Sequence, residues 1–182
     1  RGPWAGPVVA CAVVLDRAKF PSALAARLDD SKKLTERRRE ALFDPLMDCA
    51  AVGLGEASVA EIDQLNILQA TFLAMHRALV ALPARPVAAL VDGNKDPGLG
   101  LGLETRTVIK GDSRSLSIAA ASVIAKVTRD RHMHQLAEAF PGYAWEKNAG
   151  YGTRAHQQGL AERGVSPHHR RSFAPIAKLI DA

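Results

Sequence analysis

The amino-acid sequence predicts a single α/β domain over residues 1–182. Short apolar runs rich in β-branched residues are interspersed with longer segments that have the apolar periodicity of helices. No internal repeat, low-complexity segment or linker in the sequence marks a second domain. The hydrophobic share of 47% and the charged share of 24% are ordinary for a globular protein with a substantial core.

Strands are predicted in four places. Residues 7–15 and 86–94 are apolar runs bounded by turn residues, so we expect both to be buried strands. Residues 51–58 have the pattern of a strand softened by glycines, and residues 104–112 begin with strand-like alternation. The run 86–94 carries a carboxylate, Asp92, at the end of its apolar part.

Helices are predicted between and after these strands. An apolar stripe at positions 34, 42, 43, 46 and 47 indicates a helix within residues 29–50. Ser58 followed by Glu61 is the signature of a capping box, and it predicts one long helix from residue 59 to 82. Three more helical segments are expected at residues 115–140, 153–163 and 173–180.

The charge of the chain favours a polyanionic partner. The net charge is +5 and the pI is near 9.5, and the basic residues form separate clusters along the chain instead of one tail. No apolar run approaches the roughly 20 residues of a membrane span, and no secretory signal is recognisable. Cys11 and Cys49 lie in apolar contexts, as is typical of reduced thiols. We therefore expect a cytoplasmic protein.

Four polar side chains recur every four residues along the helix predicted at 115–140. They are Ser122, Lys126, Asp130 and His134. Steps of four keep side chains near one face of a helix, and the alanines of the same segment allow a close approach to a sheet. Asp130 therefore either belongs to a solvated face with Arg129 and Arg131, or is delivered to a site near Asp92.

Asp92 and Asp130 are candidate metal ligands. Asp92 ends an apolar strand, where ligand sites of α/β proteins tend to lie, although an aspartate in an Asp-Gly turn is the alternative. Carboxylates without His or Cys partners suit hard cations such as Mg²⁺ or Mn²⁺, which hydrolyse phosphodiesters in pairs about 3.5–4 Å apart. Two carboxylates are too few for such a pair, so further acidic ligands are required.

Tyr151 lies in a glycine-flanked loop among basic residues. Its ring either caps the core beneath the loop or is offered to a sugar or base of a nucleic acid. Residues 98–104 are glycine-rich, but their spacing and the preceding proline loop argue against the dinucleotide site of an oxidoreductase. No zinc spacing, P-loop or nucleophile elbow is present in the sequence.

Seven motifs follow one another along almost the whole chain. They are RGPWAGPVV (1–9), DSKKL (30–34), EIDQLNILQAT (61–71), LVDGN (90–94), KGDSRSLSIAAASVIAKVTRDR (110–131), GYGT (150–153) and HRRSFAPI (169–176). In this order they resemble ribonuclease HII, the type 2 ribonuclease H family. The segment 110–131 is the most specific of them.

This resemblance implies a ribonuclease H-like fold, a mixed five-stranded sheet flanked by helices in a single domain. It implies an endonuclease that cleaves the RNA strand of RNA–DNA hybrids with two divalent ions, Mn²⁺ or Mg²⁺. In ribonucleotide-containing duplex DNA the cut would fall 5′ of the ribonucleotide and leave 3′-hydroxyl and 5′-phosphate ends. No membrane partner is expected, and the protein would be a monomer.

The resemblance assigns the catalytic metal ligands. Asp92 would be the third and Asp130 the fourth metal-binding carboxylate of the family. Ser122 and Lys126 would support the metal site or the substrate.

The resemblance also assigns the nucleic-acid contacts. Lys32, with Ser31 beside it, would contact the phosphate near the cut. Arg1 and Gly2 would be the last two residues of a Gly-Arg-Gly loop that senses the ribose 2′-hydroxyl, the group that distinguishes RNA from DNA. Tyr151 would pack against the sugar at the RNA–DNA junction.

The family's first two metal-binding carboxylates, an Asp-Glu pair, precede the Gly-Arg-Gly loop. Because the sequence starts at the arginine of that loop, we expect this pair and its strand upstream of Arg1, and only weak metal binding and negligible cleavage by residues 1–182 alone. One alternative is a truncated, catalytically inactive relative that binds nucleic acid. Another is ribonuclease HIII, which prefers longer RNA stretches and usually carries an extra N-terminal substrate-binding domain.

Overall fold

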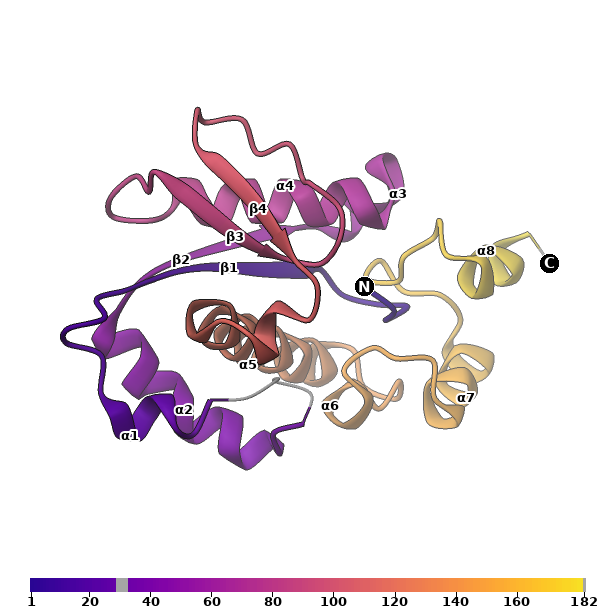
Figure 1. Cartoon of the computed structure of the whole chain (residues 1–182). Coiled ribbons are helices and arrows are strands. Elements are labelled where there is room, and N and C mark those ends of the chain that lie inside the picture. The colour runs from indigo at the N-terminus through magenta and orange to yellow at the C-terminus, as the bar shows by residue number, and fades with distance from the viewer. Residues whose placement is uncertain (29–32, 182) are drawn as a thin grey trace. The chain divides into compact units, whose positions relative to one another are not determined.

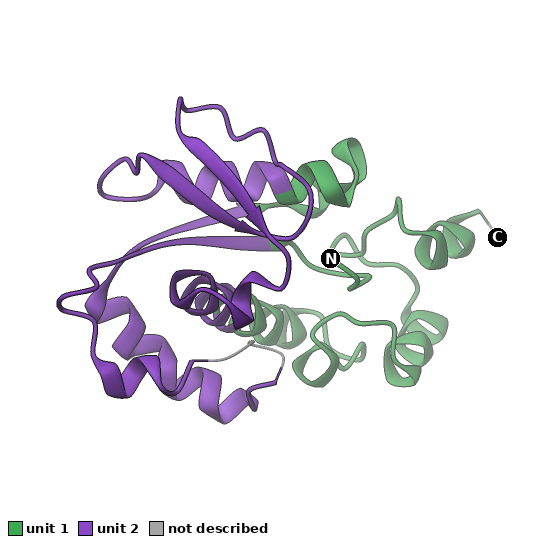
Figure 2. Ribbon diagram, viewed as in Figure 1, with its two compact units in different colours: residues 1–8, 57–71, 128–182 green, residues 9–56, 72–127 purple. Residues whose placement is uncertain are grey.

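The computed structural model describes residues 1–28 and 33–181. The chain divides into two compact units, coloured separately in Figure 2. Unit 1 comprises residues 1–8, 57–71 and 128–182, and unit 2 comprises residues 9–56 and 72–127. The single domain predicted for residues 1–182 stays a prediction.

The elements alternate between strands and helices, which confirms the α/β class (Figure 1). In chain order they are β1 (Val8–Leu15), α1 (Ser22–Ala25), α2 (Glu36–Cys49), β2 (Ala50–Ala57), α3 (Val59–Leu65), α4 (Ile67–Val80), β3 (Ala88–Asp92), β4 (Glu104–Val108), the 3₁₀ turn η1 (Gly111–Ser113), α5 (Leu116–Ala139), α6 (Trp145–Asn148), α7 (Arg154–Arg163) and α8 (Ala174–Ile180). The short helices α1 and α6 were not predicted from the sequence.

The strands of the described residues form two separate pairs. β1 pairs with β2, and β3 pairs with β4. β3 and β4 run parallel and lie side by side in Figure 1, in a register that joins Ala88 to Glu104 and Asp92 to Val108. The five-stranded mixed sheet is therefore not confirmed, because no ladder joins the two pairs in the described part of the chain.

The two apolar strands are less buried than their sequences predict. In β3 only Val91 is buried, and Leu90 is 49% exposed. In β1, Val8 and Ala10 are buried, whereas Val14 is exposed. Each strand has one hydrogen-bonded neighbour among the described residues, so part of its apolar surface stays uncovered.

The prediction of a single helix from residue 59 to 82 is wrong, because the helix is interrupted at Asn66. Asn66 has a φ of 69°, which interrupts the helix. Its side-chain oxygen accepts hydrogen bonds from the amides of Leu68 and Gln69, so it caps the second helix. The capping box that starts the first helix is confirmed, since Ser58 and Glu61 bond reciprocally.

The core of unit 2 joins the first half of α5 to α1 and α2. Its buried members are Leu24, Leu34, Leu42, Leu46, Ala120, Val123, Ile124 and Val127. Helix α4 packs against β2 through two strand glycines, because a Cβ on Gly53 or Gly55 would collide with the α4 backbone. The close approach to a sheet that was predicted for the alanine-rich helix, α5, stays a prediction.

The core of unit 1 is aromatic. It contains Ala5, Met133, Leu136, Tyr143, Trp145, Leu160 and Ile176. Tyr143 stacks on Trp145 with ring centroids 4.8 Å apart. These contacts bring together segments from both ends of the sequence.

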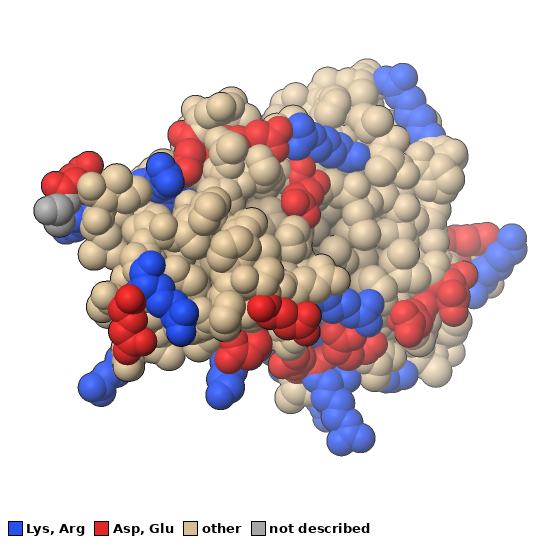
Figure 3. Space-filling view, turned by 180° about the vertical axis from the view of Figure 1, so that it is seen from behind, with Lys and Arg blue, Asp and Glu red and all other residues tan. Residues whose placement is uncertain are grey.

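On the face drawn in Figure 3, Lys and Arg side chains are interspersed with Asp and Glu side chains, so the excess positive charge is not gathered there. Within residues 1–28 and 33–181, no helix has the length and hydropathy needed to cross a membrane.

The contact between β2 and α4 gives a first prediction. Gly55→Ala should lower the free energy of unfolding by about 2 kcal/mol or more, because the added methyl group would meet the backbone at Ala74. Urea unfolding measures the change. Thr107→Ala, at an exposed strand position of β4, should stay within about 0.5 kcal/mol of the wild type. Equal stability of the two variants would contradict this packing.

Candidate functional site

Asp92 is the last residue of β3 and its side chain is held by a distant amide. Its Oδ1 accepts a 2.8 Å hydrogen bond from the backbone N–H of Gly111. The N–H of the next residue, Gly93, bonds instead to the carbonyl of Val108. The carboxylate of Asp92 therefore does not bond within a local Asp-Gly turn. Among the described residues its Oδ2 has no hydrogen-bond partner.

The conformation of residues 110–112 (Lys-Gly-Asp) explains why the N–H of Gly111 points at Asp92. Lys110 adopts a left-handed conformation with a φ of 54°, and η1 follows at once. A Cβ on Gly111 would lie 2.6 Å from Cδ1 of Ile118 and 3.2 Å from Oδ1 of Asp92, so glycine is required. The turn thus fixes Oδ1 of Asp92. It leaves Oδ2 as a hard oxygen ligand of the type that Mg²⁺ or Mn²⁺ prefers.

Ser122, Lys126 and Asp130 on α5 are half-buried, whereas His134, the fourth polar residue of this series, is exposed. Ser122 and Lys126 lie in the part of α5 that belongs to unit 2, and Asp130 lies in the part that belongs to unit 1. Since Asp92 belongs to unit 2, its predicted approach to Asp130 stays a prediction. Among the described residues no three His, Cys, Asp or Glu side chains form a metal-binding cluster. Ser31 and Lys32 lie outside the described residues.

Arg129, the neighbour of Asp130, is half-buried, and its guanidinium bonds only to backbone carbonyls. Its Nε donates to Pro7, its Nη1 to Ala149 and its Nη2 to Ala5, at 2.9–3.0 Å. Burial lowers the pKa of this guanidinium. Arg129 therefore ties the N-terminal segment, residues 1–7, to the loop that carries Tyr151.

Arg170 makes a second set of carbonyl contacts with the N-terminal segment. Its Nε donates to Gly6, its Nη1 to Arg1 and its Nη2 to Pro7, at 2.9–3.1 Å. The residue is 1% exposed, and burial together with the nearby charge of Arg129 lowers its pKa to about 9. The guanidinium is still charged at neutral pH.

Three predicted nucleic-acid residues meet at this point. A Cβ on Gly2 would lie 3.6 Å from Cε1 of Tyr151, so the ring lies against the Arg1–Gly2 backbone. Tyr151 is 47% exposed, which contradicts the alternative of a ring that caps the core. Arg1, Gly2 and Tyr151 come from opposite ends of the sequence, and unit 1 brings them together.

Two buried histidines, His156 and His169, bond to each other and, through His156, to the loop that carries Tyr151. Nδ1 of His169 accepts hydrogen bonds from the amide and hydroxyl of Ser166, so its Nε2 carries the proton and donates to Nε2 of His156 at 3.0 Å. Nδ1 of His156 then donates to the carbonyl of Tyr151 at 2.9 Å. Nε2 of His156 also accepts a hydrogen bond from Trp145, so this nitrogen is unprotonated. The chain of bonds therefore requires both imidazoles to be neutral.

The pKa values agree with this arrangement. Burial, followed by the proximity of His156, lowers the pKa of His169 to about 4. Burial also lowers the pKa of His156. The pair is therefore a neutral structural element at physiological pH and not a general acid or base.

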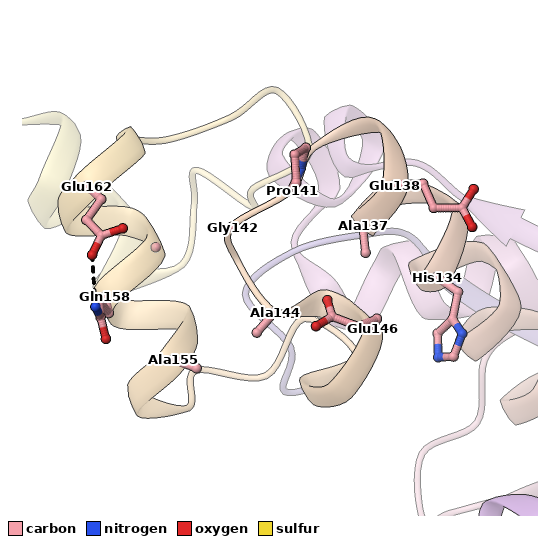
Figure 4. A pocket seen from close by; sticks show the side chains of 11 residues that line it. His134, Ala137, Glu138, Pro141, Gly142, Ala144, Glu146, Ala155, Gln158 and Glu162 are labelled. Atoms are coloured by element: carbon pink, nitrogen blue, oxygen red, sulfur yellow. Dashed lines mark hydrogen bonds between the residues drawn. The ribbon is translucent and has the colours of Figure 1, made fainter.

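A surface pocket of about 630 Å³ lies between the end of α5, α6 and α7 (Figure 4). Three glutamates contribute to its lining, and one of them, Glu162, accepts a hydrogen bond from Gln158. None of the residues predicted to act in metal or nucleic-acid binding lines this pocket. It is therefore separate from the candidate site.

Comparison with known proteins identifies the family. The sequence profile described as Ribonuclease HII matches residues 1–176. The chain belongs to the ribonuclease HII family. A ribonuclease HII of Paramagnetospirillum magneticum is 59% identical over 180 residues, which cover 99% of this chain and 89% of that protein. A ribonuclease HII of a Jannaschia species is 58% identical, with coverage of 99% and 88%.

Solved structures of ribonucleases H share the fold. The ribonuclease H2 of Pyrococcus horikoshii superposes with a TM-score of 0.83 at 27% identity, covering 100% of this chain and 93% of that one. Bst ribonuclease HIII in complex with Mn²⁺ superposes with a TM-score of 0.75 at 22% identity, covering 99% of this chain and 66% of that one. The second likeness concerns the fold alone.

Sequence reasoning missed three residues that hold the backbone around the candidate site. Arg129 and Arg170 were placed only in basic clusters of the sequence. Asp63, in the EIDQL motif, was not singled out, yet its carboxylate accepts bonds from the amides of Arg171 and Ser172. The only local signal was the position of all three within motifs that resemble the family.

The histidine pair gives a prediction for acid stability. The folded state keeps His169 neutral down to about pH 4, whereas an unfolded chain binds a proton near pH 6.5. Because the unfolded state binds more protons in this window, the free energy of unfolding should fall as the pH drops from 6.5 to 4. The shift corresponds to at most about 3 kcal/mol.

Chemical denaturation at a series of pH values measures this slope. His169→Asn should flatten the slope between pH 6.5 and 4, and His134→Asn, at an exposed position of α5, should leave it unchanged. An unchanged slope in His169→Asn would show that other groups cause the acid sensitivity.

Proposed function

We propose that this member of a family of metal-dependent endoribonucleases cleaves the RNA strand of RNA–DNA hybrids and cuts 5′ of ribonucleotides embedded in duplex DNA. The observation that carries the proposal is the juxtaposition of the Gly2 backbone with the exposed ring of Tyr151. A backbone amide beside a flat ring suits a ribose, because the ring contacts the sugar and the amide can bond its 2′-hydroxyl. Cleavage would leave 3′-hydroxyl and 5′-phosphate ends.

Asp92 and Asp130 would hold the divalent cations, Mn²⁺ or Mg²⁺, which supply an activated hydroxide and stabilise the leaving oxygen. The exposed carboxylate of Asp92, fixed through one oxygen by Gly111, supports this role. The Mn²⁺ complex of Bst ribonuclease HIII is a structural neighbour with the same fold. In the family pattern the remaining carboxylates are an Asp-Glu pair before the Gly-Arg-Gly loop, and the experiments use the full-length protein.

The other predicted residues would hold the substrate. Ser31 and Lys32 would contact the phosphate at the cut, and Ser122 and Lys126 would support the metal site or the substrate. The net charge of +5 favours association with such a polyanion. We further propose that the protein acts in the cytoplasm as a monomer.

The family comparison favours ribonuclease HII over its sister enzyme. The chain spans 89% and 88% of the two ribonuclease HII relatives described above but 66% of the ribonuclease HIII structure, which therefore contains more residues beyond the shared fold. The inactive truncated relative is the remaining alternative, and cleavage by the full-length protein excludes it.

Loss of either carboxylate should abolish cleavage. Asp92→Asn and Asp130→Asn should each lower kcat/KM by about a hundredfold or more, because an amide supplies no negative charge to a cation. The assay uses a DNA duplex with one embedded ribonucleotide and added Mn²⁺ or Mg²⁺. The control Asp96→Asn, in the loop after β3, should cleave like the wild type. Full activity in either of the first two variants would refute the assignment of that ligand.

Removal of the Tyr151 ring should weaken substrate binding. Tyr151→Ala should raise KM for the same duplex about tenfold, because stacking on an aromatic ring contributes about 1–3 kcal/mol. Tyr151→Phe keeps the ring and should stay near the wild type. A Tyr151→Ala variant with an unchanged KM would show that the ring does not contact the substrate.

A further inference from the structure

The peptide group between Arg1 and Gly2 is held at one end. Its carbonyl oxygen accepts a 2.9 Å hydrogen bond from Nη1 of Arg170. Its N–H, on Gly2, has no acceptor among the described residues. In a planar trans peptide the C=O and N–H bonds point in opposite directions, so the contact from Arg170 fixes the direction of the Gly2 N–H.

The charge of Arg170 also strengthens this donor. A cation that bonds to a carbonyl oxygen draws electron density from the peptide group and makes its N–H a better donor. Within the described residues all the hydrogen bonds of this guanidinium go to backbone carbonyls and none to a carboxylate. The oxygens of Asp63, the nearby acid, bond instead to Arg171 and Ser172.

The donor lies beside the exposed ring of Tyr151. A Cβ built on Gly2 would lie 3.6 Å from Cε1 of Tyr151, so the side-chain face of Gly2 looks onto the ring edge with about the room of one methyl group between them. A sugar that rests on this ring therefore brings its hydroxyl groups close to the Gly2 N–H.

We propose that Arg170 is a positioning residue that orients and polarises the Gly2 amide for the 2′-hydroxyl of a ribonucleotide. This inference rests on the proposed function, in which Gly2 and Tyr151 contact the ribose. Arg170 touches no substrate. It acts through the peptide group that it holds.

Arg129 provides a matched control. It makes the same number of carbonyl bonds in the same buried region, but its partners are Ala5, Pro7 and Ala149 and not the Arg1–Gly2 peptide. A structural defect common to both arginines would affect both lysine variants, whereas loss of the oriented amide would affect only Arg170→Lys. A lysine keeps the charge but presents a single ammonium group, which cannot reproduce the three-way contact.

The test compares two duplexes that differ by one 2′-hydroxyl. Fluorescence anisotropy in EDTA, at one fixed ionic strength, gives the affinity of the full-length protein for a DNA duplex with a single ribonucleotide and for the all-DNA duplex. Arg170→Lys should lower the ratio of the two affinities about tenfold, the effect of one hydrogen bond, while Arg129→Lys keeps the wild-type ratio. A thermal melt of each variant reports its stability separately.

The outcomes are distinct. An unchanged ratio in Arg170→Lys, or an equal loss in Arg129→Lys, would overturn the positioning role. If the wild type does not distinguish the duplexes, the proposed function itself fails. If Arg170→Lys does not fold, Gly2→Pro decides, because it removes the N–H at an exposed position and leaves the buried arginines intact. Gly2→Pro should lose the discrimination, and a wild-type ratio in that variant would overturn the proposal.

Discussion

The bond from the buried guanidinium of Arg170 to the Arg1–Gly2 peptide is the interaction on which the proposed recognition of a ribose depends. Arg129 and Arg170 each donate three hydrogen bonds, and both reach the carbonyl of Pro7. A buried carbonyl without a partner costs about 1–3 kcal/mol, so the N-terminal segment and the two charges stabilise one another. No apolar side chain could take this place, because the carbonyls that converge there would remain unpaired.

Further contacts hold the proposed recognition surface together. The N-terminal segment pairs with the loop before α7 through the bond from the Trp4 amide to Gly150, and Ala5 forms a β-bridge with His169. In the same loop, Nδ1 of His156 donates a hydrogen bond to the carbonyl of Tyr151. The backbone that carries the exposed ring and the Gly2 amide is therefore held by a network of hydrogen bonds, which fixes the position of both groups before a substrate binds.

Features encoded by neighbouring residues could be predicted from the sequence, and features encoded by distant ones could not. The strands and the capping box at Ser58 follow from local patterns and are confirmed. The break at Asn66 and the exposure of Leu90 depend on backbone geometry and on the number of neighbouring strands. The partners of the two arginines lie as far as 124 residues from Arg129 and 169 residues from Arg170, so each guanidinium looks solvated in its local sequence.

A crystal structure of the full-length Asp130→Asn variant with a duplex that contains one ribonucleotide would test the account most directly. The account predicts the Gly2 nitrogen within about 3 Å of the 2′-oxygen, the carbonyl of Arg1 still bonded to Arg170, and the sugar against the ring of Tyr151. A ribonucleotide whose 2′-hydroxyl contacts another part of the protein, with Gly2 and Tyr151 away from the substrate, would contradict it.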